Sequence, residues 1–276
     1  MILYQVIFGS YSKEKFEEAS DLVESYLISL SRNGQIFYET NRVVPWQENV
    51  IAYVDVIGPQ ANRLKYHSKD GLKKLDKVKD YFKQEPVWNI HEDCPAIRET
   101  SWKAASSLFL YADPFEISSP ISHGDREASI PVYLFPFSDQ MRDEIYCWQT
   151  KYRHLTRIWF DGDALETPAY RELSFSESKL SQEGRCLCKE IEKATNIPTY
   201  YFLKRFYCYE DYEKERCRPC PSCGKPWLVP SYEGFFHSPF FQFDFRCKSC
   251  RLVSHTGFHI SNRYAKIGDL LNKNLR

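Results

Sequence analysis

Four cysteines near the C-terminal end of the sequence have the spacing of a metal site. Cys220 and Cys223 form one C-x-x-C pair, Cys247 and Cys250 form a second, and 23 residues separate the pairs. Each pair lets two thiolates point inward from one tight turn, and Gly224 allows the positive φ with which such a turn ends. Because Zn²⁺ prefers four soft ligands in a tetrahedron, the sequence predicts one structural zinc ion in a C-terminal zinc ribbon.

Other ligands are available within the same segment. Cys217 could pair with Cys220, but the C-P-S-C-G sequence has the turn residues of a zinc knuckle, so we favour Cys220 with Cys223. Three histidines could also bind metal: His237, His255 and His259. With four thiolates present, we expect these histidines on the surface or in packing. Four thiolates close the coordination shell, whereas a catalytic zinc keeps an open position, so no catalysis is expected.

No other motif predicts a reaction. The sequence contains no GxGxxG, P-loop, HExxH or GxSxG pattern. The acidic residues Asp161, Asp163 and Glu166 are interpreted as a turn followed by a helix start, because the remaining positions of an EF-hand loop are missing. The sequence His123-Gly124-Asp125 is interpreted as a polar turn, since nothing nearby supplies a nucleophile or metal-ligand spacing.

Charge is balanced overall but uneven along the chain. The formal net charge is zero, which removes a bulk electrostatic case for nucleic-acid binding. Locally, residues 63–83 hold eight Lys or Arg against three Asp, and residues 246–276 hold seven against one. The first segment could be a phosphate or nucleic-acid footprint, but pairs such as Asp76 with Lys79 favour a solvated helix face. Together with nearby aromatics, the second could neutralise and stack a single nucleic-acid strand, although half of those aromatics must form the small core of the ribbon.

Composition favours a folded protein of a reducing compartment. Of the 276 residues, 43% are hydrophobic and 16% aromatic, enough for a sizeable core. The N-terminus has neither a basic segment nor an apolar run of signal-peptide length, and ten cysteines without such a signal indicate the cytoplasm.

Hydrophobic periodicity predicts an α+β fold. Strands are expected at 2–8, 36–39, 49–57, 107–112, 130–135 and 199–207. Helices are expected at 12–31, 71–84, 177–194 and from residue 138 to about 155. The β-α-β-β-α order of the first part predicts a split βαβ unit. The predicted segments are an α/β portion at 1–90, a second at 91–212 that can share one core with the first, and the ribbon with its tail at 213–276.

Several segments together resemble a known bacterial family. These are GRCLC at 184–188, Ile191-Glu192, PTYYFL at 198–203, Ser119-Pro120 with Gly124-Asp125, and the CPSCG and CKSC motifs. The combination resembles a family of zinc-ribbon proteins of uncertain function for which nucleic-acid binding is suggested. In general style, an aromatic-rich, neutral chain poor in motifs also resembles immunity proteins, which neutralise a bacterial toxin by occluding its active site.

The sequence thus predicts a non-catalytic, zinc-containing protein that binds a macromolecule. Because aromatic residues are good interface anchors and the net charge is zero, an immunity-type inhibitor with a toxin as protein partner is the leading hypothesis. Its expected contacts are Tyr232, Phe235, Phe236, Asp161, Asp163 and Glu166. The alternative is single-stranded DNA or RNA binding, with Lys248, Arg251 and Arg263 as contacts. No membrane partner is expected.

Overall fold

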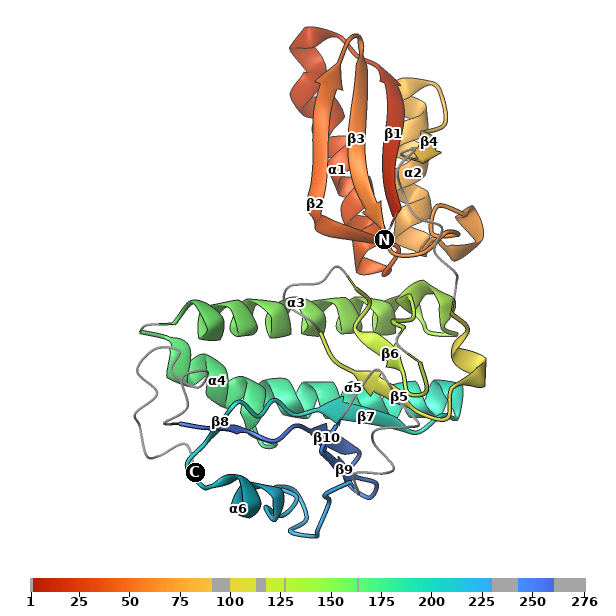
Figure 1. Cartoon of the computed structure of the whole chain (residues 1–276). Helices are drawn as coiled ribbons and strands as arrows, with labels where there is room; N and C mark the ends of the chain where they lie inside the picture. The colour runs from red at the N-terminus through yellow and green to blue at the C-terminus, as the bar shows by residue number, and fades with distance from the viewer. Residues whose placement is uncertain are drawn as a thin grey trace. The chain divides into compact units, whose positions relative to one another are not determined.

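The computed structural model of the chain describes residues 2–90, 100–112, 118–126, 128–162, 164–229 and 243–260. Helices and strands are interspersed along the chain, and the described strands form three separate sheets (Figure 1). This confirms the predicted α+β class. The chain divides into two units. Unit 1 comprises residues 1–100, 117–119 and 130–147, and unit 2 comprises 101–116, 120–129 and 148–276. Within the described residues, no helix combines the length and apolar character needed to cross a bilayer.

Unit 1 is a βαββαβ unit. Its elements are β1 (Ile2–Ser10), α1 (Phe16–Arg32), β2 (Ile36–Trp46), β3 (Asn49–Val56), α2 (Lys69–Phe82) and β4 (Val87–Ile90), with 3₁₀ turns η1 (Lys13–Lys15) and η2 (Leu64–Tyr66). The strands lie in the order β2-β3-β1-β4, and all neighbours are antiparallel. This arrangement confirms the predicted split βαβ topology, which places β1 and β3 in the middle of the sheet.

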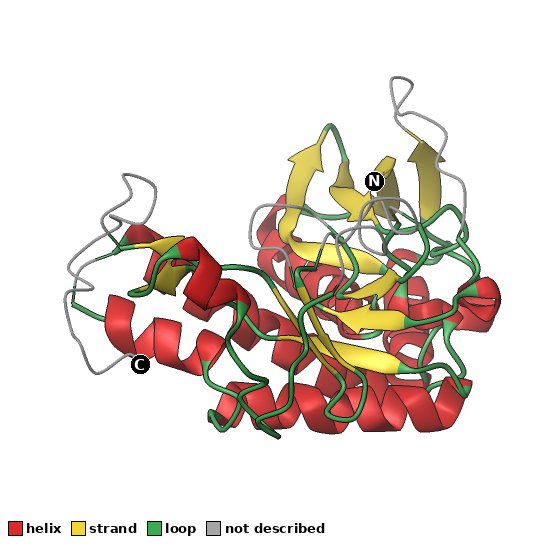
Figure 2. Cartoon of the chain, turned by 60° about the horizontal axis from the view of Figure 1, so that its bottom comes forward, coloured by secondary structure: helices red, strands yellow, loops and turns green. Residues whose placement is uncertain are grey.

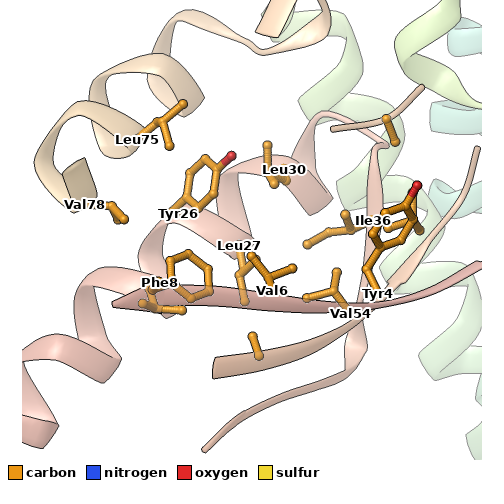
Figure 3. Packing of buried hydrophobic residues seen from close by; sticks show 14 of the residues in the cluster. Tyr4, Val6, Phe8, Tyr26, Leu27, Leu30, Ile36, Val54, Leu75 and Val78 are labelled. Atoms are coloured by element: carbon orange, nitrogen blue, oxygen red, sulfur yellow. The ribbon is translucent and has the colours of Figure 1, made fainter. Parts of the chain in front are cut away.

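The core of unit 1 lies between one face of the sheet and the two helices (Figure 3). Alternate residues of β1, namely Tyr4, Val6 and Phe8, point to the same face, as the period of a strand requires. From α1, Tyr26, Leu27 and Leu30 pack against them at helical spacing. The sequence pattern therefore determined both faces of this core.

The structure differs from the expected elements in several places. The expected strand at 130–135 is wrong: the segment contains the 3₁₀ turn η4 (Val132–Leu134), because Pro131 lacks the N–H that a ladder needs. Two short strands were missed, β4 and β6 (Ile121–His123). Neither shows alternation, since β6 is buried throughout and β4 is largely exposed. His123 thus ends a buried strand, and only Gly124 and Asp125 lie in a turn.

Unit 2 is built on a five-stranded sheet in the order β6-β5-β7-β10-β9. The strands besides β6 are β5 (Leu108–Leu110), β7 (Thr199–Phe202), β9 (Phe245–Cys247) and β10 (Leu252–Ser254). β7 is parallel to both β5 and β10, and the two outer pairs are antiparallel. The strand predicted at 199–207 is divided into β7 and β8 (Tyr207–Cys208), and β8 pairs with β11 (Phe258–His259).

Unit 2 also contains several helices (Figure 2). They are α4 (Glu166–Ser174), α5 (Lys179–Thr195), α6 (Tyr212–Arg216) and the short 3₁₀ turn η3 (Trp102–Ala104). Helix α3 (Asp139–Asp161) has its residues up to Cys147 in unit 1 and those from Trp148 in unit 2.

Helix α5 packs closely on β7 because Gly184 has no side chain. A Cβ at this position would lie 2.2 Å from Cε2 of Tyr201 and 2.8 Å from Nε1 of Trp148. Both rings are fully buried, so neither can move aside freely. The indole of Trp148 also donates to the carbonyl of Leu180 on α5 at 3.3 Å, which fixes the ring.

A buried carboxylate organises the C-terminal half of unit 2. Glu215 on α6 is 2% exposed, and Arg205 donates to its two oxygens at 3.1 and 3.0 Å. Nε of Arg218 lies 2.9 Å from Oε1, and the backbone N–H of Gly257 donates to the same oxygen at 3.1 Å. Burial acts to raise the pKa of Glu215, but the two arginines outweigh it and hold that pKa below its usual value.

Changing Gly184 to Ala should destabilise the protein. Alanine favours a helix over glycine by about 1 kcal/mol, whereas overpacking a well-filled core costs about 1–3 kcal/mol. Because the contact with Tyr201 is far inside van der Waals distance, we expect the second effect to win. Urea unfolding measures the change, with the exposed Cys186→Ala on the same helix as control. A Gly184→Ala variant more stable than wild type would contradict this packing.

Changing Glu215 to Gln should lower the free energy of unfolding by about 3 kcal/mol, because two partly buried guanidinium groups lose their counter-charge. The exposed Glu213→Gln on the same helix is the matched control and should change little.

The effect should also depend on pH. The pKa of Glu215 is lowered on folding, so its contribution is present above the ordinary glutamate pKa of about 4.3 and is lost as the pH falls through the folded value. The gap in stability between wild type and Glu215→Gln should therefore narrow below about pH 4. A gap independent of pH would contradict the ionised state of Glu215.

Candidate metal centre

The first cysteine pair lies in a knuckle that follows α6. The N–H of Cys220 donates to the carbonyl of Lys225 at 2.9 Å, and the N–H of Gly224 donates to the carbonyl of Cys220 at 2.8 Å. These two bonds close the turn, and Gly224 has the predicted positive φ, +70°. Backbone N–H groups of Ser222 and Cys223 point at the sulfur of Cys220, and that of Lys225 points at the sulfur of Cys223.

The second pair lies at the turn of the β9–β10 hairpin. Cys247 is the last residue of β9 and Cys250 precedes β10, with Cys247 paired to Leu252. Arg251 has φ +54° in this turn, an uncommon conformation for a residue with a side chain. Its guanidinium makes two bonds to Glu192 on α5, at 2.9 and 2.6 Å, and these hold the turn against the helix.

The two turns bring the four sulfur atoms together. The sulfurs of Cys220, Cys223, Cys247 and Cys250 all lie within 4.8 Å of one another, and those of Cys223 and Cys247 are 3.7 Å apart. A tetrahedral ion with metal–sulfur bonds of about 2.3 Å separates its ligands by about 3.8 Å. A disulfide would bring sulfurs to about 2.05 Å. The donor set and its spacing therefore fit one metal ion bound by four thiolates.

The backbone tunes the thiols for this role. The N–H of Lys225 lowers the pKa of Cys223 to about 6, which favours its thiolate form. Burial raises the pKa of Cys220 to about 12 and also raises that of Cys250. A bound cation would lower the pKa of all four thiols, because it stabilises the thiolate form of every ligand. Without such a charge, four thiolates cannot share this volume.

Arg218 connects the first turn to the second. Its guanidinium lies 4.1 Å from the ring centre of Phe245 and 4.7 Å from that of Trp227. It also donates to the hydroxyl of Ser254 at 2.9 Å and to the carbonyl of His255 at 2.8 Å. The charge of Arg218 is balanced by Glu215, so the same buried pair supports both halves of the four-cysteine cluster.

The alternative ligands lie elsewhere. Within the described residues, the four cysteines are the one group of His, Cys, Asp and Glu side chains that could hold an ion together. Cys217 is exposed at the end of α6, and His255 packs against the rings of Phe202 and Phe243. His259 is exposed in β11, and His237 lies outside the described residues.

A basic groove adjoins the cysteine cluster. It has a volume of about 390 Å³ and is lined by Lys225, Pro226, Trp227, Leu228, Val229, Arg246, Cys247, Lys248 and Ser249. Lys225, Arg246 and Lys248 are cationic, and no acidic residue is among the described residues of the lining. Lys225 and Lys248, each one or two residues from a cysteine, are exposed. The two cysteine turns thus place positive charge on one surface.

The structure places the predicted nucleic-acid contacts differently. Lys248 is exposed and lines the groove, whereas Arg251 is paired with Glu192. Arg263 lies outside the described residues. Lys225 and Arg246 were not among the predicted contacts. Their positions directly after CPSCG and before CKSC are a sequence signal that could have identified them.

The predicted protein contacts are mostly outside the described residues. This applies to Tyr232, Phe235, Phe236 and Asp163. Asp161 is exposed at the end of α3. Glu166 requires a correction: it is 2% exposed and accepts a hydrogen bond from the hydroxyl of Tyr207 at 2.9 Å. It therefore stabilises the interior of unit 2 and is not available as a contact for a protein partner.

Comparison with known proteins gives family matches but no function. Models of two domains of unknown function match residues 102–204 (DUF2310) and 210–260 (DUF8594), and the second match contains all four cysteines. No solved structure matches the chain. None of these matches is described as a zinc ribbon, so the resemblance to a zinc-ribbon family stays a prediction.

Two relatives are uncharacterized proteins of Haemophilus influenzae. One is 35% identical over 151 residues, which cover 54% of this chain and 71% of that protein. The other is 34% identical over 151 residues, and the match spans only 55% of its length. Because the first match covers more than two thirds of the relative at this identity, the chain belongs to the family of that Haemophilus influenzae protein.

Proposed function

We propose that this is a non-catalytic zinc-ribbon protein that binds single-stranded nucleic acid at the groove beside its metal centre. The observation that carries the proposal is the groove lining, with Lys225, Arg246 and Lys248 and no acidic residue among its described members. Phosphates are the anions that such a group of cations recognises most generally. The exposed side chain of Leu228 adds an apolar contact for a base.

Zinc is the metal that this donor set favours. Four thiolates in a tetrahedral arrangement select zinc over hard cations such as Mg²⁺ or Ca²⁺, which prefer oxygen ligands. Four protein ligands leave no position for water or substrate, so the ion has a structural role. Its contribution is to fix the two turns that carry Lys225 and Lys248.

A toxin-neutralising immunity protein is the second candidate. It is favoured by the zero net charge and by the exposed side chains of Phe160 and Leu165, which are 45% and 59% accessible near the exposed carboxylate of Asp161. Large apolar side chains at the surface are common anchors of protein interfaces. We rank this candidate lower because the groove provides a more specific chemical complement than isolated exposed side chains do.

Purified protein should contain about one zinc ion per chain. The double variant Cys220→Ser/Cys223→Ser should lose the metal and the fold of the C-terminal turns, because binding energy at such a site is folding energy. The matched control is Cys217→Ser, which should keep full zinc content. Metal analysis and circular dichroism measure both. Zinc retained by the double variant, or a turnover that depends on zinc, would contradict the assignment.

Single-stranded DNA or RNA should bind with a strong dependence on salt. The double variant Lys225→Ala/Lys248→Ala should weaken binding and flatten the plot of log affinity against log salt by about 0.7 per lost phosphate contact. Fluorescence titration at two salt concentrations measures both effects. The control is Lys189→Ala/Lys193→Ala, which removes the same charge from the exposed face of α5.

Two outcomes would favour the inhibitor hypothesis instead. One is the absence of measurable binding to either nucleic acid by the zinc-loaded protein. The other is growth rescue of cells expressing a cognate toxin, with loss of rescue in a Phe160→Ala/Leu165→Ala variant. The Lys225→Ala/Lys248→Ala variant should leave such rescue unchanged. The nucleic-acid hypothesis thus predicts an effect of the lysine substitutions, and the inhibitor hypothesis predicts an effect of the Phe160 and Leu165 substitutions.

A further inference from the structure

The hairpin that carries two metal ligands is also part of the main sheet of unit 2. Its strands β9 and β10 are the last two of the five, and β10 pairs directly with the central strand β7. The N–H of Tyr201 donates to the carbonyl of Arg251, and that of Leu203 donates to the carbonyl of Val253, both at 2.9 Å. The cysteine cluster is therefore continuous with the sheet, and is not a separate module.

The hairpin has little that could keep it folded alone. Each of its strands has three residues, and an isolated two-stranded hairpin is marginal in water. Its turn places Arg251 at φ +54° and crowds the sulfurs of Cys247 and Cys250 against those of the first turn. A bound cation offsets the repulsion between these thiolates and so favours closure of this turn.

The side chains of the hairpin are buried by the sheet. Phe245, Leu252 and Val253 have no exposed surface, and Val253 belongs to a cluster with Phe109, Tyr200, Phe202 and Phe243. Release of the hairpin would expose this cluster and leave β7 with an unpaired edge. The clamp between Arg251 and Glu192 connects the same turn to α5.

We propose that metal occupancy of the four-cysteine cluster controls whether the β9–β10 hairpin remains in the sheet of unit 2. The metal then acts as a conformational switch on β7, and its loss opens the sheet. This inference rests on metal binding as part of the proposed function, but not on the identity of any partner.

Amide hydrogen exchange of the full chain tests the proposal. After a chelator removes the metal, as verified by metal analysis, the amides of Tyr201 and Leu203 should exchange at least about tenfold faster. Amides in the pairing of β1 with β3 should be unchanged, because they belong to unit 1. Unchanged protection of Tyr201 and Leu203 in metal-free protein would overturn the inference while leaving the metal site intact. Protein that never binds metal would overturn both.

A substitution outside the ligands gives a second test. Glu192→Gln removes the charge that holds Arg251, so the same two amides should exchange several-fold faster with metal still bound. Glu183→Gln is the matched control, since Glu183 lies on the same helix and pairs with Lys151 at 2.8 Å on the surface. Equal exchange in the two variants would contradict the role of the clamp in keeping the hairpin on β7.

Discussion

The pairing of the buried Glu215 carboxylate with two arginines is the interaction on which the C-terminal half of unit 2 depends. It is removed from water and compensated by Arg205 and Arg218, so the segment that leads into α6, the helix itself and a third, distant segment must meet around it. The third segment contributes the N–H of Gly257 just after β10. Because a buried charge without partners is costly, this requirement determines where α6 ends and where the first cysteine turn begins.

Arg218 extends that constraint into the cysteine cluster. Its guanidinium is stacked on Phe245 and bonded near the end of β10, while its carbonyl accepts a hydrogen bond from Trp227 at 3.0 Å. The four thiols are thus positioned by a polar network on one side and by β7 on the other. A small group of ligands gains its geometry from a much larger part of unit 2, which also explains why the adjoining lysines are held in a defined place.

The N-terminal unit follows a different principle. Its apolar core follows from alternation in β1 and β3 and a three-and-four repeat in α1. Among the buried polar residues of unit 1 is His67, whose Nε2 lies 2.8 Å from the hydroxyl of Tyr26. Burial lowers the pKa of this histidine, so it serves as a neutral hydrogen-bond partner inside unit 1.

The sequence by itself determined the four cysteines, the positive φ of Gly224 and the βαββα order, because these depend on spacing within single segments. It did not reveal that Glu166 is buried, that Arg251 is bound to Glu192, or that the β9–β10 hairpin joins the sheet of β7. Each of these depends on partners at least 40 residues away, as with Glu166 and Tyr207, 41 positions apart. Local periodicity carries no information about such pairings, so only the tertiary structure decided them.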